Sequence, residues 1–294
     1  MINKLIKMFL VGFIFISFNS IVNAQELTPH PPLFGFPSKP MPVGHWVVRG
    51  YWMYNNYDLK YNNAEQSMSD IPENFSYSTN VVWGKVRYGI SKRITAVVNL
   101  PYINKTMKNG NVSKTGNGLG DIITALRYNL YANKKSKFWF TTLLYAKFAT
   151  GKSTGLTATE LPTGTGSFDY GLIFIPEKSF GNLDMRFSAA YFVRGKNNAD
   201  VDLGDLLWFS LMSDYNLSNR IIVEASLNYK RTFLNNKNGV NIENSDTYLF
   251  QILPGIEYRF GHRFYIQGVV PINLSQKRPF GNRYETWLGL YYMI

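Results

Sequence analysis

Residues 146–153 read Ala-Lys-Phe-Ala-Thr-Gly-Lys-Ser, close to a phosphate-binding loop with alanine at its first glycine position. Such a loop needs a buried parallel strand before it and a helix after it, so that its backbone amides point at the phosphates. Here the preceding segment is amphipathic, and Thr154-Gly155 does not begin a helix. Nucleotide binding is therefore not predicted.

Three histidines could support catalysis or metal binding in this chain, which has no cysteine. A barrel phospholipase needs a histidine and a serine within hydrogen-bonding reach on its lipid-facing side. His30, His45 and His262 lie in a proline-rich segment, at the start of the first predicted strand and in a predicted turn, without such a serine. No cluster has metal-ligand spacing. The sequence therefore predicts no catalytic residue, no metal, no cofactor and no enzyme.

The elements that must position any functional residue are segments in which apolar and polar residues alternate, as in strands. The alternation is clearest over residues 183–194, 220–231 and 247–260. Long and short connections take turns along the chain, whereas soluble sheet proteins do not sort their connections by side. The sequence therefore predicts an all-β fold, a transmembrane antiparallel up-and-down β-barrel of about 12 strands with periplasmic termini.

The connections divide into two kinds, and no stretch after residue 24 approaches the length of a membrane-spanning helix. The long ones are predicted to be outer loops and cover residues 59–73, 104–117, 151–166, 195–204, 235–246 and 275–283. The short ones are predicted to be periplasmic turns and cover residues 89–92, 132–136, 178–182, 218–219 and 261–262.

The first residues indicate export. Residues 1–24 have the character of a cleaved signal peptide, with Lys4 and Lys7 before an apolar run that is too short for a transmembrane anchor. Residues 25–44 contain six prolines, too many for a strand or a helix. They are predicted to form a periplasmic lead-in, with a plug folded into the lumen as the alternative. Residues 45–294 are predicted to form the barrel in the cell outer membrane of a Gram-negative bacterium.

The charge of the chain is strongly basic, with 31 Lys and Arg residues against 19 acidic ones. Removal of the signal peptide leaves 29 basic residues and a formal charge of +10. Outer-membrane lipid and lipopolysaccharide are the expected partners, followed by anionic solutes, whereas nucleic acid is not expected. Basic residues assigned to loops and turns are Lys105, Lys108, Lys114, Lys134, Lys135, Lys137, Lys152, Lys196, Lys237, Lys277, Arg278 and Arg283.

Charged residues on the predicted inner face imply either water in the lumen or a salt-bridge network that nearly fills it. A barrel of this size should have a narrow or occluded pore. Arg127, Lys147 and Arg186 are candidates for a selectivity constriction, and a structural network is the alternative. The pore-lining candidates are Asp121, Arg127, Lys147, Asp169, Asp184, Arg186, Glu224, Lys230, Glu257 and Arg259; Arg49, Lys85, Arg87 and Glu285 share the predicted wall.

The last predicted strand places Tyr284, Leu288, Leu290 and Tyr292 on one face and ends at Ile294. It resembles the C-terminal insertion signal of outer-membrane proteins, although that signal usually ends on Phe or Trp. The resemblance implies the outer-membrane insertion machinery as a partner.

Three short motifs resemble those of the outer-membrane transporters named for the meta pathway of phenol degradation. They are Gly118-Leu119-Gly120-Asp121 followed by Arg127-Tyr128, Lys147-Phe148-Ala149-Thr150-Gly151, and Leu161-Pro162-Thr163-Gly164-Thr165-Gly166-Ser167-Phe168-Asp169. Gly118, Gly120, Gly151, Gly164 and Gly166 are the motif glycines, and they are predicted to permit bends or bulges where chains descend from outer loops. Asp121 and Asp169 are predicted at the outer mouth, where a salt bridge, loop orientation or cation binding are the alternatives.

That family is allied to the long-chain fatty-acid transporters, so the resemblance implies a channel for passive uptake of small hydrophobic or aromatic compounds. The alternative is a structural or surface-interacting barrel that binds lipopolysaccharide or a host ligand without transport.

Overall fold

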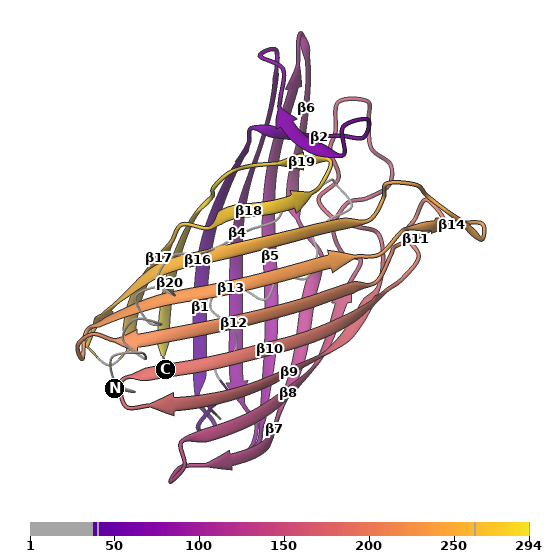
Figure 1. Cartoon of the computed structure of the whole chain (residues 1–294). Helices are drawn as coiled ribbons and strands as arrows, with labels where there is room; N and C mark the ends of the chain where they lie inside the picture. Colours follow the sequence, from indigo (N-terminus) through magenta and orange to yellow (C-terminus); the bar gives the residue numbers. More distant parts are fainter. Residues whose placement is uncertain (1–37, 40, 262, 294) are drawn as a thin grey trace.

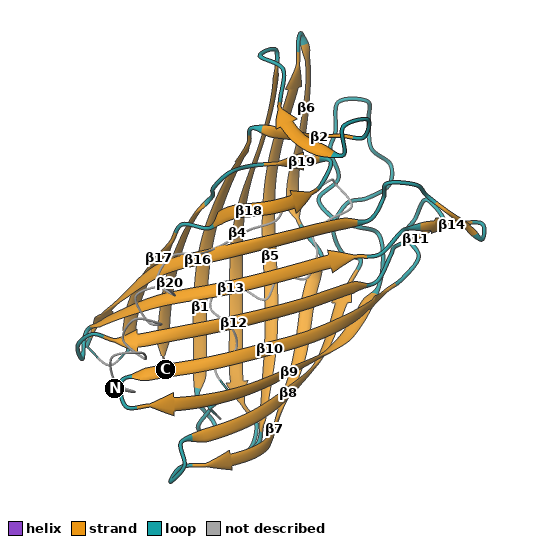
Figure 2. Cartoon of the chain, viewed as in Figure 1, coloured by secondary structure: helices purple, strands orange, loops and turns teal. Residues whose placement is uncertain are grey.

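The computed structural model describes residues 38–39, 41–261 and 263–293 of the chain. The predicted signal peptide, most of the proline-rich segment, His30 and His262 lie outside the described residues. Regular structure in the described residues consists of strands joined by loops (Figure 2). Within the same residues, no helix is long and apolar enough to cross a membrane.

Twelve antiparallel strands of the described chain close into a barrel (Figure 1), which confirms the predicted fold. Closure is made by the first and last strands, which pair from Val47↔Met293 to Tyr54↔Thr286. Two barrel strands consist of two segments each, β6 with β7 and β17 with β18. The barrel strands are β1 (Trp46–Tyr57), β4 (Phe75–Gly89), β5 (Ile94–Asn109), β6 (Val112–Leu119) with β7 (Ile122–Asn133), β8 (Phe138–Phe148), β9 (Asp169–Phe180), β10 (Leu183–Arg194), β12 (Leu206–Asn216), β13 (Ile221–Thr232), β16 (Thr247–Phe260), β17 (Phe264–Val269) with β18 (Ile272–Lys277), and β20 (Thr286–Met293).

Short strands decorate the end of the barrel that carries the long loops (Figure 1). One small sheet contains β2 (Leu59–Asn62), β3 (Ser67–Asp70) and β19 (Phe280–Gly281). The other contains β11 (Val201–Asp202), β14 (Asn236–Lys237) and β15 (Val240–Asn241). The opposite end has short turns, so the predicted sorting of connections by length is correct.

One predicted loop is wrong. Residues 104–117 do not form an irregular connection, because β5 and β6 pair continuously from Tyr102↔Leu119 to Asn109↔Val112. Gly110 makes the turn with a φ of 55°. The polar composition misled the prediction, since a hairpin that rises above the rim has water on both faces and needs no apolar alternation.

The strands follow the period-two pattern because each has lipid on one side and the lumen on the other. In β10, Phe187 and Tyr191 point outward and are 42% and 46% exposed, whereas Arg186 and Ser188 point inward and are buried. A closed barrel leaves no strand edge unpaired, which is required where lipid offers no hydrogen bonds.

The lumen is layered. A belt of buried apolar and aromatic side chains, hereafter the apolar belt, fills its middle. Its members include Tyr51, Trp83, Val97, Ile123, Leu143, Tyr145, Ile173, Ile175, Phe192, Leu206, Trp208 and Trp287. Charged side chains lie above the belt toward the loops and below it toward the turns. In β8, for example, Lys147 lies above Leu143 and Tyr145. Sequence alternation predicted the charged layers but missed the belt, because a strand with apolar residues on both faces shows no alternation.

Candidate functional site

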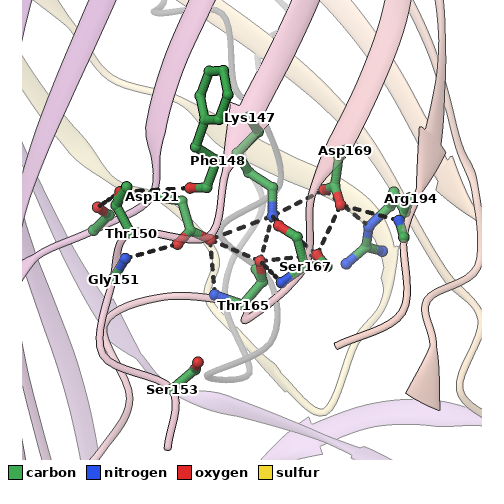
Figure 3. Close-up of polar contacts among 12 residues, drawn as sticks. Asp121, Lys147, Phe148, Thr150, Gly151, Ser153, Thr165, Ser167, Asp169 and Arg194 are labelled. Carbon is green, nitrogen blue, oxygen red and sulfur yellow. Dashed lines mark hydrogen bonds and ion pairs between the residues drawn. The ribbon is translucent and has the colours of Figure 1, made fainter. Parts of the chain in front are cut away.

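The three sequence motifs meet in one buried cluster at the loop end of the lumen (Figure 3). Asp121 lies between β6 and β7, Lys147 near the end of β8 and Asp169 at the start of β9. Because Lys147 and Asp169 are directly opposite in the β8–β9 register, adjacent strands bring the charges together. Their side chains are at most 1% exposed.

Lys147 is the centre of the cluster. Its Nζ is 3.3 Å from Asp121 Oδ2 and 3.0 Å from Asp169 Oδ2. The same ammonium donates hydrogen bonds to the Thr165 hydroxyl and, at 3.1 Å each, to the carbonyl and hydroxyl oxygens of Ser167. A buried ammonium is costly unless it is paired and fully hydrogen-bonded, and here both conditions hold.

Asp121 binds the chain on both sides of the long loop at residues 149–168. Its Oδ1 accepts a hydrogen bond from the Gly151 amide at 3.0 Å, just after β8. Its Oδ2 accepts from the amide and hydroxyl of Thr165 at 2.8 and 2.7 Å, shortly before β9. One carboxylate therefore holds together the two ends of this loop.

Asp169 links the cluster to β10. Its Oδ1 accepts hydrogen bonds from the Ser167 hydroxyl at 2.7 Å and from the Gly195 amide at 3.3 Å. Its Oδ2 is 3.8 Å from Nε of Arg194, which is also buried. Two carboxylates and two cations balance one another within a water-poor site.

Further contacts fix the loop 149–168 to the barrel. Lys105, pointing inward from β5, donates a hydrogen bond to the Pro162 carbonyl at 2.8 Å. The Thr163 hydroxyl donates to the Leu119 carbonyl at 2.8 Å, and Thr115 exchanges backbone hydrogen bonds with the loop at Thr159 and Leu161. The loop is thus held against the mouth of the lumen from the β5–β6–β7 side.

Close packing requires three of the motif glycines. A Cβ on Gly151 would lie 2.6 Å from the Gly164 Cα, and a Cβ on Gly164 would lie 2.5 Å from Asp121 Oδ1. Gly120 is similarly crowded, with a Cβ position 2.6 Å from the Ile103 side chain. Gly118 and Gly166 have positive φ, 148° and 73°, which agrees with the predicted bends, whereas Gly120, Gly151 and Gly164 are needed for close packing.

The remaining pore-lining candidates lie apart from this cluster, mostly toward the turn end. Arg127 is opposite Leu143, four residues below Lys147 on β8, so Arg127, Lys147 and Arg186 do not share one level. The contacts of the others are Asp184 with Lys39, Arg186 with Asp214, Glu224 with Gln267, and Glu257 with Arg259 and Tyr291, while Lys230 lies near Glu285 and Arg278.

Sequence reasoning missed or misplaced several of these side chains. Arg194 lies on the inward face of β10. Extending the period-two pattern of that strand by one further position on the same face would have identified it. Lys105 is predicted in an outer loop but lies in β5, and Arg278 lies in the predicted connection, between β18 and β19; both are buried, at 0% and 1% exposed, rather than on the outer surface. Both sit near strand ends, where sequence composition does not separate lumen from solvent.

The described part of the proline-rich segment contacts the lumen wall. Ser38 accepts a hydrogen bond at its carbonyl from Asn129 at 2.5 Å and donates its amide to Glu177 at 2.6 Å. Lys39 is 2.7 Å from Asp184, and Arg127 donates to the Lys39 carbonyl at 2.6 Å.

Ion pairs also order the loops outside the membrane. Hydrogen bonding from Lys152 lowers the pKa of the Glu160 carboxyl on the loop 149–168. Hydrogen bonds to Asp70 and Asp58 raise the pKa of Arg283 and join the last outer loop to the first. These exposed contacts are individually weak.

A closed barrel with a lipid-facing apolar surface, and with one long loop held against its mouth, defines the class as an outer-membrane β-barrel. The chain belongs to the family described as the MetA-pathway of phenol degradation, whose model matches residues 69–284. The resemblance seen in the motifs is therefore confirmed, as is the outer-membrane location.

Two solved structures are similar to this chain. An outer membrane channel from Pseudomonas putida F1 has a TM-score of 0.75 at 15% identity, covering 89% of this chain and 100% of that chain. The translocator domain of autotransporter NalP from Neisseria meningitidis has a TM-score of 0.51 at 11% identity, covering 86% of this chain and 89% of that chain. At these identities the likeness concerns the fold alone. A comparison with curated proteins found no match.

Proposed function

We propose that this protein is an outer-membrane channel through which small hydrophobic or aromatic compounds enter the cell by passive diffusion. The apolar belt is the observation that carries the proposal. Its aromatic members include Tyr145, Phe192 and Trp208, all buried inside the barrel. A water-filled pore for hydrophilic solutes needs polar walls throughout, whereas an apolar solute gains by contact with such a belt.

Both ends of this path are narrow. The loop 149–168 packs against the β5–β6–β7 side of the outer mouth, and Ser38 and Lys39 bind the wall toward the other end. These contacts favour a lumenal plug over a periplasmic lead-in for residues 38–39, the described part of the proline-rich segment. A solute can therefore pass only when these segments move locally. This requirement is more consistent with slow, selective entry than with the function of a general porin.

The proposal involves no catalytic step and no cofactor. The carboxylates at the loop end are engaged with Lys147 and Arg194, so they are not poised as acid or base. The proposed partners are the solute, the lipid and lipopolysaccharide around the barrel, and the machinery that inserts it.

Uptake by intact cells tests the proposal, because a lipopolysaccharide leaflet slows the entry of apolar solutes. Cells that produce the protein should accumulate radiolabelled toluene several-fold faster than cells that lack it, with no change for arabinose. The belt variant Trp208→Glu should reduce toluene uptake, whereas Trp208→Phe should retain it. Heat-modifiable migration in gels checks that each variant folds.

Equal toluene uptake with and without folded protein would overturn the proposal. Binding of purified lipopolysaccharide by that same inactive barrel would then favour the alternative, a structural or surface-interacting protein with basic outer loops.

A further inference from the structure

Toward the turn end of the lumen, beside the apolar belt, four cations gather on one side. Arg49 on β1 is directly opposite Lys85 on β4, and Arg87 follows two residues further along the same face. Arg127 on β7 completes the group, which is hereafter called the basic cluster. Arg49 and Arg127 interact electrostatically with Arg87.

The register explains why these side chains face one another. Arg87 is opposite Val97, and Arg127 is opposite Thr95, so the two arginines flank β5 one pleat apart. Thr95 and Val97 are short, which leaves the space above β5 to the guanidinium groups. Arg87 and Arg127 are only 5% and 1% exposed.

Among the described residues, the three arginines of this cluster form no direct ion pair with a carboxylate, although Glu177 interacts electrostatically with Arg127, and Glu257 with Arg49. Arg49 donates to the Tyr51 hydroxyl at 3.0 Å and lies over the Tyr291 ring at 4.2 Å, and Arg127 donates to the Lys39 carbonyl. Nε of each arginine, and Nη1 of Arg127, have no hydrogen-bond acceptor. The arginine ion pairs of the described residues instead involve Arg186, Arg194, Arg259 and Arg283.

Several like charges, buried and partly without acceptors, are unfavourable unless an anion joins them. A carboxylate is well suited, because its two oxygens match the planar donor fork of a guanidinium. Immediately above the cluster, Tyr51 and Trp83 are opposite each other and point into the lumen. Their rings lie one pleat from Arg49 and Lys85 and two pleats from Arg87.

We propose that the basic cluster, together with Tyr51 and Trp83, is a binding site for a small aromatic carboxylate, with the carboxylate at Arg87 and Arg127 and the ring against the aromatic pair. This inference rests on the proposed channel function and narrows its solute class. The nearby carboxylates Glu177 and Glu257 each have another cation as ion-pair partner, Lys39 and Arg259, so the site combines an apolar surface with net positive charge.

Equilibrium dialysis of radiolabelled benzoate with the folded, detergent-solubilised protein tests the site without requiring transport. Wild-type protein should bind benzoate more tightly than neutral benzyl alcohol. The Arg87→Gln variant should bind benzoate roughly tenfold more weakly, the effect of losing one charge-assisted contact, with benzyl alcohol binding unchanged. The Arg87→Lys variant, which keeps the charge but loses the fork, should fall between them.

The matched control is Arg231→Gln, on the exposed outer face of β13, which should bind benzoate as wild type does. Arg87→Gln should fold at least as well as wild type, because it relieves repulsion within the cluster. If it does not fold, Arg127→Gln replaces it in the same assay.

Equal binding of benzoate and benzyl alcohol by wild type, or benzoate binding unaffected by Arg87→Gln, would overturn the inference. Toluene uptake by cells tests the channel separately, so a protein that binds benzoate but does not speed toluene entry would refute the proposed function alone.

Discussion

At the scale of single residues, cation binding between Asp121 and Asp169 is one of the predicted alternatives. In the structure, the ammonium of Lys147 occupies that position. The two carboxylates and the cations Lys147 and Arg194 cancel in charge. The cluster therefore acts as an internal pin for the loop 149–168. Such a pin is sensitive to the loss of any one member, because the charge left behind is buried and unpaired.

Replacing Lys147 with methionine should destabilise the barrel by about 3–5 kcal/mol, since both carboxylates lose their central partner. Urea unfolding of the detergent-solubilised protein measures this change. Lys152→Met is the matched control, because its pair with Glu160 is 49% and 35% exposed and should contribute far less. Equal effects of the two substitutions would show that the buried cluster is not the pin.

Gly151→Ala should also destabilise the protein, by about 1–3 kcal/mol, because the new methyl group overlaps Gly164. The comparison is Gly50→Ala, where a Cβ has nothing within 4 Å. Melting temperatures in detergent should fall for the first variant and hold for the second. A neutral Gly151→Ala would mean that the loop can shift away from the wall at little cost.

At the scale of elements, the loop 149–168 and the β5–β6 hairpin behave as one unit at the barrel mouth. Thr115 on the hairpin and Leu161 on the loop are joined by a 2.7 Å backbone hydrogen bond. The hairpin thus extends the wall upward and gives the loop a support. A loop tied to a wall in this way restricts the mouth more than a free loop of equal length.

Shortening this loop should open the mouth. Lys152 and Thr163 already exchange hydrogen bonds, so residues 154–161 can be replaced by two glycines without stretching the chain. Single-channel conductance in planar bilayers should rise several-fold. Removing residues 237–240 from the β14–β15 hairpin should leave conductance unchanged, and an equal rise in both variants would contradict a special role for the loop 149–168.

At the scale of the whole molecule, closure depends on β20, which pairs with β1 on one side and β17 on the other. Removing it would expose the backbone groups of both neighbours to lipid, where nothing else satisfies them. A chain truncated after Glu285 should therefore lose the folded, heat-modifiable form in gels, while the β14–β15 deletion keeps it. A folded form of the truncated chain would show that the barrel closes in another register.

Much of this architecture could be predicted, because it depends on local signals. Alternation along β10 and β13 indicates lipid on one side, and loop lengths order the strands, whatever their distant neighbours are. The motif glycines and the residues Asp121, Lys147 and Asp169 could also be singled out. Alternation could not reveal the apolar belt, because the residue types of Trp83 and Tyr145 do not indicate that their side chains point inward.

The sequence by itself determined an approximate strand count, the alternation of long and short connections and the outer-membrane location, because hydrophobic patterning and turn composition act over a few residues. Only the tertiary structure decided that Lys147 lies between two carboxylates, that Gly151 touches Gly164, and that Arg49, Arg87 and Arg127 meet without a direct ion pair to a described carboxylate. Those contacts join different strands, and they depend on the register in which neighbouring strands pair and on how the loop 149–168 folds back. The strand register and the path of this loop are set by the closed barrel as a whole, so no single segment of the sequence reveals them.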